Sequence, residues 1–493
     1  MKILLVYPEY PDTFWSFRHA LKFISKKAAN PPLGLITVAS ILPEDWEKKL
    51  IDLNVESLKS EDIIWADFVF ISAMNVQLES VFEIIWKCRS LKTKIVAGGP
   101  FFTAEYLRFS KIDHFVLNEA EITLPEFIRD LKNEQLKRVY QTTEFADLNH
   151  SPLPDYSLIK QSKYSSLSIQ YTRGCPYNCE FCDITALLGH KVRSKTSDQI
   201  LNELQNIYDS GWRKNVFFVD DNFIGNKKTL KEVLLPEVIE WMKIRNFPFR
   251  FSTEVSIDLA DDNELMGLMI SAGFETVFIG IETTEEKSLT ECNKVQNKNR
   301  SLVESVRRIQ DHGIEVSGGF IVGFDNDSKQ VFQNQIDFIQ KSGIVTAMVG
   351  LLNAPRKTKL YQRLKNEGRI IQETSGNNTD YSLNFIPKMN TEELIKGYKK
   401  VLNRIYSGES YYKRVLEFLK RFYPIDRVKK KISFSLIVAF FKSMIILGIV
   451  DKFRFSYWRL VFWSLINRPQ LLTKAITYSV YGYHFRKVFK EVL

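Results

Sequence analysis

The stretch YTRGCPYNCEFCDI, residues 171–184, gathers three of the five cysteines of the chain in the spacing C-x3-C-x2-C. Three is an odd number for disulfide pairing and one short of the four ligands of a structural zinc site. Three thiolates can instead hold three irons of a [4Fe–4S] cluster and leave the fourth iron open to a small molecule. We therefore predict an iron–sulfur cluster held by Cys175, Cys179 and Cys182.

The residues around the cysteines bear on the choice between a cluster and zinc. Gly174 and Pro176 are turn residues that suit a short loop bent around one cube-shaped cluster. A zinc ion with His190 as its fourth ligand is the alternative, although zinc sites usually combine two C-x2-C pairs. A disulfide would leave an odd thiol behind.

Composition and charge limit the class of protein. The chain has 493 residues, of which 45% are hydrophobic, as in a folded protein with sizeable cores. Five unevenly spaced cysteines favour a reducing, cytoplasmic compartment, and the opening MKILLVYPEY lacks the length and cleavage site of a signal peptide. Residues 421–493 carry 14 Lys+Arg against 3 Asp+Glu, so the rest of the chain is near neutral. That balance, with so apolar a basic segment, argues against nucleic-acid binding.

The first part of the chain, residues 1–145, alternates short apolar runs with segments of helical periodicity. This alternation predicts a Rossmann-like α/β domain with a mostly parallel sheet covered on both faces. Ligands of such sheets bind outside the carboxyl ends of the strands. The predicted strand ends carry Ser72, Gly98, Gly99 and Asn118.

A proline-containing linker, residues 146–165, leads into a second α/β region at 166–390. About six strand–helix repeats follow one another up to residue 354, which is short of a full eight-stranded barrel. We therefore predict a partial (β/α)6 barrel.

The last region, residues 391–493, is predicted to be helical, basic and apolar. Residues 432–450, ISFSLIVAFFKSMIILGIV, approach the length of a membrane span but contain Lys442. Three interpretations remain open: helices lying on a membrane surface, a helical cap packed on the barrel, and a true span. The first would place the enzyme in the cytoplasm, peripheral on the inner face of the membrane.

The cysteine motif, with the aromatic Phe181 before its last cysteine and a position after the first strand of a βα barrel, resembles the radical S-adenosylmethionine (SAM) enzymes. The resemblance implies that the open iron binds the amino and carboxylate groups of SAM. One electron from the cluster then cleaves SAM to methionine and a 5′-deoxyadenosyl radical. A reducing partner such as flavodoxin or ferredoxin is implied as well.

The resemblance also implies residues that bind SAM at the ends of the barrel strands. The family commonly has Gly-Gly-Glu after the second strand, where this chain has Asp-Asp-Asn at 220–222. FIGIET, residues 278–283, resembles the fourth-strand motif of the family. The implied SAM-binding residues are Phe181, Asp220, Asp221, Glu254, Ser256 and Glu282.

A strand–helix domain in front of such a barrel, with PPLGLITVASILP at 31–43 and AGGPFFT at 97–103, is similar to the cobalamin-binding class of the family. The cobalt-ligating motif D-x-H-x-x-G is absent, which fits the subgroup in which no protein histidine binds cobalt. The implied cobalamin-binding residues are Ser72, Gly98, Gly99, Asn118 and Glu119.

With both cofactors, the resemblance implies methylation of an unactivated carbon. GIVTAMVGLLNAPRKTKLY, residues 343–361, resembles a subgroup that includes methylases of bacterial hopanoids, and the basic, aromatic C-terminal region independently indicates a lipid. We therefore expect a hydrophobic substrate. One alternative is a ring-forming, oxidising or coupling enzyme of the same barrel, in which cobalamin is redox-active or absent. Another is a cluster-bearing sensor protein without turnover.

Overall fold

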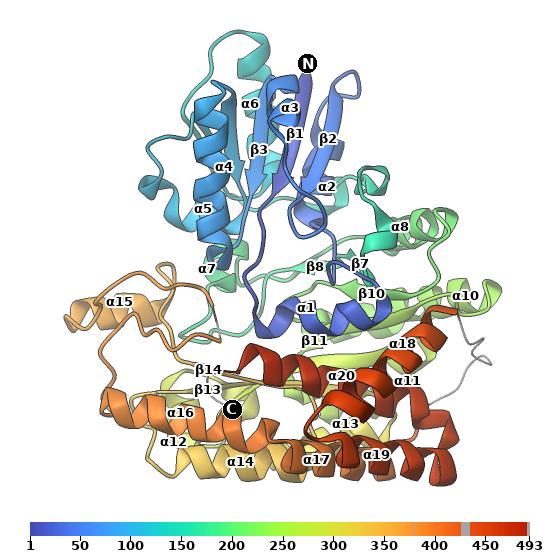
Figure 1. The fold of residues 1–493 in the computed structure, drawn as a ribbon. Helices are drawn as coiled ribbons and strands as arrows, with labels where there is room; N and C mark the ends of the chain where they lie inside the picture. The colour runs from blue at the N-terminus through green and yellow to red at the C-terminus, as the bar shows by residue number, and fades with distance from the viewer. Residues whose placement is uncertain (378, 425–433, 491–493) are drawn as a thin grey trace.

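The computed structural model describes residues 1–377, 379–424 and 434–490. An N-terminal α/β unit lies over a central barrel, and the C-terminal helices pack against the barrel from below (Figure 1). The first two residues of the predicted apolar segment 432–450 lie outside the described residues.

The N-terminal unit is built on a six-stranded parallel sheet of order β2-β1-β3-β4-β5-β6. Alternate residues of each strand point to opposite faces, and each face is covered by helices because both are apolar. The strands are β1 Lys2–Tyr7, β2 Glu47–Asp52, β3 Phe68–Ser72, β4 Lys94–Gly98, β5 His114–Val116 and β6 Val139–Tyr140. On one face lie α3 Ser60–Trp65, α4 Leu78–Ser90 and α5 Pro100–Glu105, and on the other α2 Leu33–Ile41 and α6 Ala120–Lys132.

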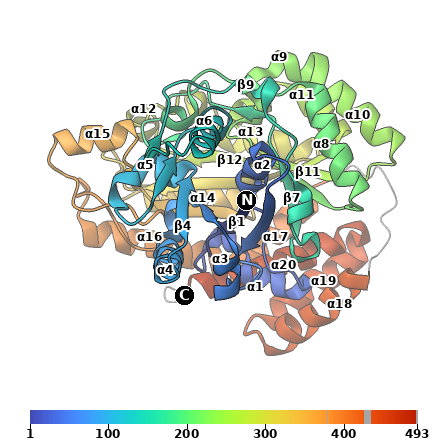
Figure 2. The same ribbon diagram turned by 90° about the horizontal axis from the view of Figure 1, so that it is seen from above.

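The central region forms a six-stranded parallel sheet of order β7-β10-β11-β12-β13-β14, so the predicted partial (β/α)6 barrel is confirmed. Its strands are β7 Ser166–Ile169, β10 Asn215–Phe218, β11 Arg250–Val255, β12 Phe274–Glu282, β13 Glu315–Val322 and β14 Ala347–Leu351. The outer helices include α8 Ser197–Asp209, α10 Leu235–Ile244, α11 Asn263–Ala272, α13 Leu302–Asp311 and α14 Val331–Ser342. Seen from above, the N-terminal strands lie over these barrel strands (Figure 2).

The C-terminal region is helical, as predicted. Its helices are α15 Lys359–Asn366, α16 Thr391–Tyr406, α17 Gly408–Arg421, α18 Phe434–Ile445, α19 Arg454–Asn467 and α20 Leu472–Val488. The hydroxyl of Tyr398 donates to the carbonyl of Val349 at 3.1 Å, so α16 covers the edge strand β14. Buried residues of α20, including Tyr478 and Phe485, belong to the same core as the barrel.

The predicted apolar segment 432–450 does not form one straight span. Helix α18 passes into a π-helical turn, Ile446–Val450, and Asp451 then takes an extended conformation. Nowhere in the described parts of the chain is there a helix both long and apolar enough to cross a membrane.

Candidate functional site

The cysteine loop begins where a short antiparallel pair, β8 Thr172–Arg173 and β9 Arg193–Ser194, closes. Gly174 has φ +91°, and a Cβ there would lie 2.6 Å from the carbonyl oxygen of Lys191. Only glycine fits this close approach in the left-handed region. The backbone N–H of Cys175 then donates to the carbonyl of Gly189 at 3.2 Å, which sets the direction of the loop.

The three motif cysteines are free thiols: Cys179 is buried, and Cys175 and Cys182 are partly buried. Thiolates around one zinc would lie roughly 4 Å apart, given Zn–S bonds of about 2.3 Å. Within the described chain, these Sγ atoms and neighbouring ligand atoms form no group of three or more lying within 4.8 Å of one another. His190 is exposed.

Burial raises the pKa of Cys175, Cys179 and Cys182, and a nearby positive charge, Lys294, opposes the shift at each of them. Desolvation penalises a free thiolate in such a place. Iron offsets this penalty because metal-bound thiols are deprotonated.

Asp220 follows β10 and is almost completely buried. Its carboxylate accepts hydrogen bonds from the backbone N–H groups of Tyr171 and Thr172 and from the Thr172 hydroxyl, the last at 2.6 Å. Asp220 therefore ties the end of β10 to the strand that enters the cysteine loop.

Asp221 and Glu254 are carboxylates at the barrel mouth that could still bind a ligand. The Oδ2 atom of Asp221 is buried and has no hydrogen-bond partner among the described residues. Burial, with Asp220 as the next cause, raises the pKa of Asp221 to about 7. Burial and the repulsion from Asp221 raise the pKa of Glu254 to about 8. Such a cluster of buried acids is suited to a cationic ligand, because a positive charge relieves their repulsion.

Glu282 ends β12 with φ +62°, and its carboxylate pairs with Lys294 at 2.8 Å. A Cβ at Gly280 would lie 2.2 Å from that carboxylate, so this glycine leaves room for the pair. Burial opposes the charge on Lys294, but Glu282 and Cys179 outweigh it and raise the pKa of Lys294. The pair thus holds the Lys294 ammonium group near Cys179 of the cysteine loop.

The remaining predicted SAM residues lie at the same barrel mouth. Ser256 donates through its backbone N–H to the side-chain oxygen of Asn222 at 3.1 Å, which joins the ends of β10 and β11. The ring of Phe181 packs edge-on against Phe324, with centroids 6.1 Å apart.

The sequence patterns did not reveal the residues that hold the cysteine loop in place but lie far from it along the chain. Lys294 lies in the segment after α12 Glu286–Glu291, and Arg363 of α15 binds the loop residue Glu180 at 2.7 Å. The Glu180 backbone N–H also donates to the carbonyl of Cys292 at 2.9 Å. No spacing in the sequence connects these residues to the motif, so only their position in the fold reveals them.

In the N-terminal unit, Ser72, Gly98 and Gly99 come together at the carboxyl ends of β3 and β4. A Cβ at Gly98 would lie 2.4 Å from the carbonyl oxygen of Val116, and one at Gly99 2.4 Å from the Ser72 hydroxyl. Neighbouring strands alone therefore require glycine at both positions.

Asn118 and Glu119 follow β5 at the same edge. Asn118 has φ +63°, and its N–H donates to the hydroxyl of Thr103 at 2.9 Å. Glu119 is 5% exposed, and both its oxygens accept hydrogen bonds from Arg193 of β9, at 2.7 and 2.8 Å. The Glu119 side chain is thus part of the joint between the two sheets.

The carboxyl ends of both sheets face each other across this joint. Besides Glu119–Arg193, Glu121 at the start of α6 pairs with Arg173 at 2.7 Å, directly before the cysteine loop. Directly after β3, Met74 is half exposed, and Asn75 has a buried side-chain oxygen without a partner in the described chain. A ligand at the edge of the N-terminal sheet would face the barrel mouth, and the unsatisfied Asn75 oxygen fits a polar ligand there.

Three protein-family models match separate parts of the chain. Residues 24–128 match the B12 binding domain, and residues 169–339 match the radical SAM superfamily. Residues 358–493 match a domain of unknown function, DUF4070.

Two relatives and one solved structure are similar over most of the chain. An uncharacterized methyltransferase of Synechocystis sp. is 39% identical over 100% of this chain and 92% of its own. The hopanoid C-2 methylase of Rhodopseudomonas palustris is 34% identical over 84% of this chain and 78% of its own. The radical SAM methyltransferase TsrM of Kitasatospora setae, with cobalamin and a [4Fe–4S] cluster bound, has the same fold with a TM-score of 0.62, 13% identity and coverage of 96% and 98%.

A B12-binding domain in front of a radical SAM domain is the arrangement of the cobalamin-binding radical SAM enzymes. The chain belongs to this family, and within it to the methyltransferases. Its cofactors are a [4Fe–4S] cluster, SAM and cobalamin.

Proposed function

We propose that this enzyme methylates an unactivated carbon of a hydrophobic, hopanoid-like lipid that it meets at a membrane surface. The similarity to a hopanoid C-2 methylase supports the lipid class. The observation that carries the proposal is an apolar surface that the C-terminal helices leave exposed.

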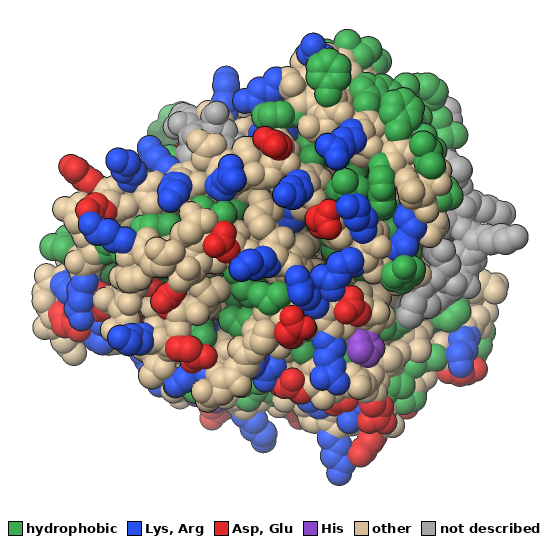
Figure 3. All heavy atoms as spheres, turned by 90° about the horizontal axis from the view of Figure 1, so that it is seen from below, with side chains coloured by type: hydrophobic (Ala, Val, Ile, Leu, Met, Phe, Trp, Pro, Cys, Tyr) green, Lys and Arg blue, Asp and Glu red, His purple; other side chains and the backbone are tan. Residues whose placement is uncertain are grey.

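This surface, the apolar face of α18 and α19, consists of large side chains at helical spacing. Ile437, Phe441, Ile445 and Ile449 follow one another at intervals of four residues, which places them on one side of the helix. Its exposed members are Leu436, Ile437, Phe441, Ile445, Ile449, Val450, Phe455, Phe462, Leu465 and Ile466. Hydrophobic side chains gather at the corresponding corner of the molecule, at the upper right of Figure 3.

The charge around this face suits anionic headgroups. Lys452, Arg454 and Arg459 are exposed beside it. Asp451 is the one acidic residue between 434 and 490, and it pairs with Arg486 at 3.0 Å. A large exposed apolar patch with basic neighbours is typical of a surface that docks on a membrane.

For the site residues, we propose that Cys175, Cys179 and Cys182 hold the cluster. Asp221, Glu254, Ser256, Glu282 and Phe181 would surround SAM, with Asp220 holding the loop in place. Ser72, Gly98, Gly99 and Asn118 would face cobalamin, with Glu119 fixing the sheet that carries it. The corresponding domains are residues 1–145, 166–390 and 391–493, with a linker at 146–165.

When bound, the cofactors would supply a radical that abstracts a hydrogen atom from the substrate carbon, and a methyl group that takes the place of that hydrogen. The chain itself orients and shields these reactants. Asp221 and Glu254 offer negative charge to the cationic part of SAM, while Lys294 fixes Glu282 beside the cysteine loop. The ion pairs between the two sheets hold their carboxyl ends together. This keeps the two cofactor sites close to each other, as a transfer between them requires. A small reducing protein, such as a flavodoxin or ferredoxin, would supply the electrons.

Membrane docking is tested by sedimentation with phosphatidylglycerol vesicles. We expect the wild-type protein to sediment with them and the double variant Phe441→Asp/Phe462→Asp to stay in the supernatant. Ile244→Asp, at a still more exposed apolar position on α10, is the control and should still sediment. These point changes are preferable to removing the tail, because α20 is part of the barrel core. Equal sedimentation of the double variant and the control would refute the docking surface.

The substrate class is tested by turnover on vesicles that contain a pentacyclic triterpenoid. We expect methylated triterpenoid to form in proportion to 5′-deoxyadenosine. Radical formation that yields an unsaturated, cyclised or coupled product without a new methyl group would favour the non-methylating alternative.

A further inference from the structure

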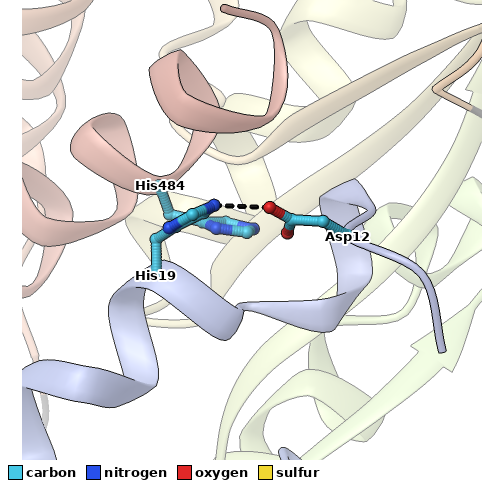
Figure 4. A group of neighbouring side chains, drawn as sticks. All are labelled: Asp12, His19 and His484. Carbon is cyan, nitrogen blue, oxygen red and sulfur yellow. Dashed lines mark hydrogen bonds and ion pairs between the residues drawn. The ribbon is translucent and has the colours of Figure 1, made fainter. Parts of the chain in front are cut away.

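A second group of potential ligands, none of them among the proposed cofactor residues, joins the two ends of the chain. Asp12 precedes the turn η1 Phe14–Ser16, His19 is on the short helix α1 Arg18–Leu21, and His484 is on α20. The three residues each offer one ligand atom within 4.8 Å of the other two. The two imidazole rings lie next to each other and extend toward Asp12 (Figure 4).

His484 has the state expected of a metal ligand. Its side chain is fully buried, and its Nε2 donates to the carbonyl oxygen of Phe14 at 3.0 Å. A carbonyl only accepts, so Nε2 carries the proton and Nδ1 keeps its lone pair. That Nδ1 has no hydrogen-bond partner among the described residues. Metal-binding histidines commonly donate their other N–H to a backbone carbonyl in this way.

The surroundings of His484 hold its ring in place. Phe17 stacks on it with centroids 5.3 Å apart, and the neighbouring Phe485 stacks on Phe14 at 4.3 Å. Trp15 of the same segment contacts Phe278 of β12 edge-on at 5.3 Å. The buried His484 ring is therefore fixed in position between the barrel and the C-terminal helix.

Asp12 and His19 supply the other two potential metal ligands, from the solvent side. His19 Nε2 and Asp12 Oδ2 are 2.5 Å apart, and both side chains are partly exposed, so an ion can reach them. Two imidazoles and one carboxylate are a donor set that zinc and other divalent transition metals prefer, and a fourth position would stay open to water.

We propose that Asp12, His19 and His484 form a site for a divalent transition metal, with Zn²⁺ as its preferred occupant. The metal would join the segment that follows β1 to helix α20, and so brace the C-terminal helices against the barrel. It is separate from the iron–sulfur cluster and from cobalamin, because none of its ligands belongs to either cofactor set.

The test measures zinc and iron together in the full-length enzyme loaded with its cluster and cobalamin. The protein is equilibrated with ZnCl₂, separated from free metal by gel filtration and analysed by elemental mass spectrometry. We expect Asp12→Asn and His19→Ala to bind about one zinc fewer per chain than the wild-type protein, with unchanged iron. His312→Ala, which removes a partly exposed histidine after α13, is the control and should keep the wild-type zinc content. Equal zinc in all four proteins would overturn the proposal.

A second measurement does not depend on metal counting. Because an ion that binds only the folded state raises its stability, ZnCl₂ should raise the Tm of the wild-type and His312→Ala proteins. It should leave the Tm of Asp12→Asn and His19→Ala unchanged. A Tm of the wild-type protein that does not respond to zinc would also contradict the site. Neither variant alters the buried His484, so a failure to fold does not confuse the comparison.

Discussion

At the scale of single residues, Glu254 shows how the barrel mouth is prepared for a cation. Its pKa of about 8, against an ordinary value of 4.5, means that the ligand-free protein holds a proton there at neutral pH. Burial and the neighbouring Asp221 cause this shift. A cationic ligand would reverse it, because the charged form of the carboxylate then gains a partner.

The raised pKa of Glu254 makes the stability of the ligand-free protein depend on pH. The folded protein keeps the proton up to about pH 8, whereas the unfolded chain releases it near pH 4.5. Raising the pH from 5 to 8 therefore lowers the free energy of unfolding. We expect Glu254→Gln to have a Tm a few degrees above wild type at pH 8 and no advantage at pH 5, as measured by calorimetry. Identical Tm differences at both pH values would contradict the raised pKa.

At the scale of elements, the end of β12 depends on a glycine that leaves space for an ion pair. A Cβ at Gly280 would lie 2.2 Å from the Glu282 carboxylate and 2.8 Å from the Lys294 ammonium. The strand thus turns its last residue, Glu282, back over Gly280 toward the next segment of the chain. A side chain at this point would displace both partners.

We expect Gly280→Ala to weaken SAM binding about tenfold while the iron content stays normal, since a shift of one ångström in a positioned group can cost at least this much. Equilibrium binding of SAM and iron analysis of the same preparation measure the two effects. Gly267→Ala is the control, because a Cβ there meets no atom within 4 Å and α11 should gain from alanine. SAM affinity equal to that of the control would place the Glu282–Lys294 pair outside the SAM site.

At the scale of the whole molecule, buried ion pairs join the two sheets. Glu119 is held by Arg193, and Glu121 by Arg173, so the sheet that binds cobalamin is fixed to the strands beside the cysteine loop. The role of Glu119 at cobalamin, which the family resemblance implies, stays a prediction, and its carboxylate pairs with Arg193 in the structure.

Removing one member of such a buried pair leaves the other charge unpaired, which costs about 3 kcal/mol. We therefore expect Glu119→Gln to lower the Tm and to speed protease cleavage within the linker 146–165, while bound corrinoid stays at the wild-type level. Asp261→Asn breaks the exposed pair with Arg300 and should leave the protein near wild type. Loss of corrinoid without faster cleavage would return Glu119 to the cobalamin site.

The local patterns of the sequence determined the cysteine motif, the alternation of strands and helices, and the barrel of six strands. They could do so because a cluster-binding loop and a buried parallel strand are each encoded within a few neighbouring residues. The same patterns indicated helices after residue 390, without deciding which of their apolar faces is buried.

Only the tertiary structure decided the contacts between distant segments. It brought Lys294 beside Cys179, paired Glu119 with Arg193, and buried α20 while leaving the apolar face of α18 and α19 exposed. It also placed His484 beside Asp12, from opposite ends of the chain. These contacts depend on how complete elements pack, and packing selects neighbours by shape and charge rather than by their separation in sequence.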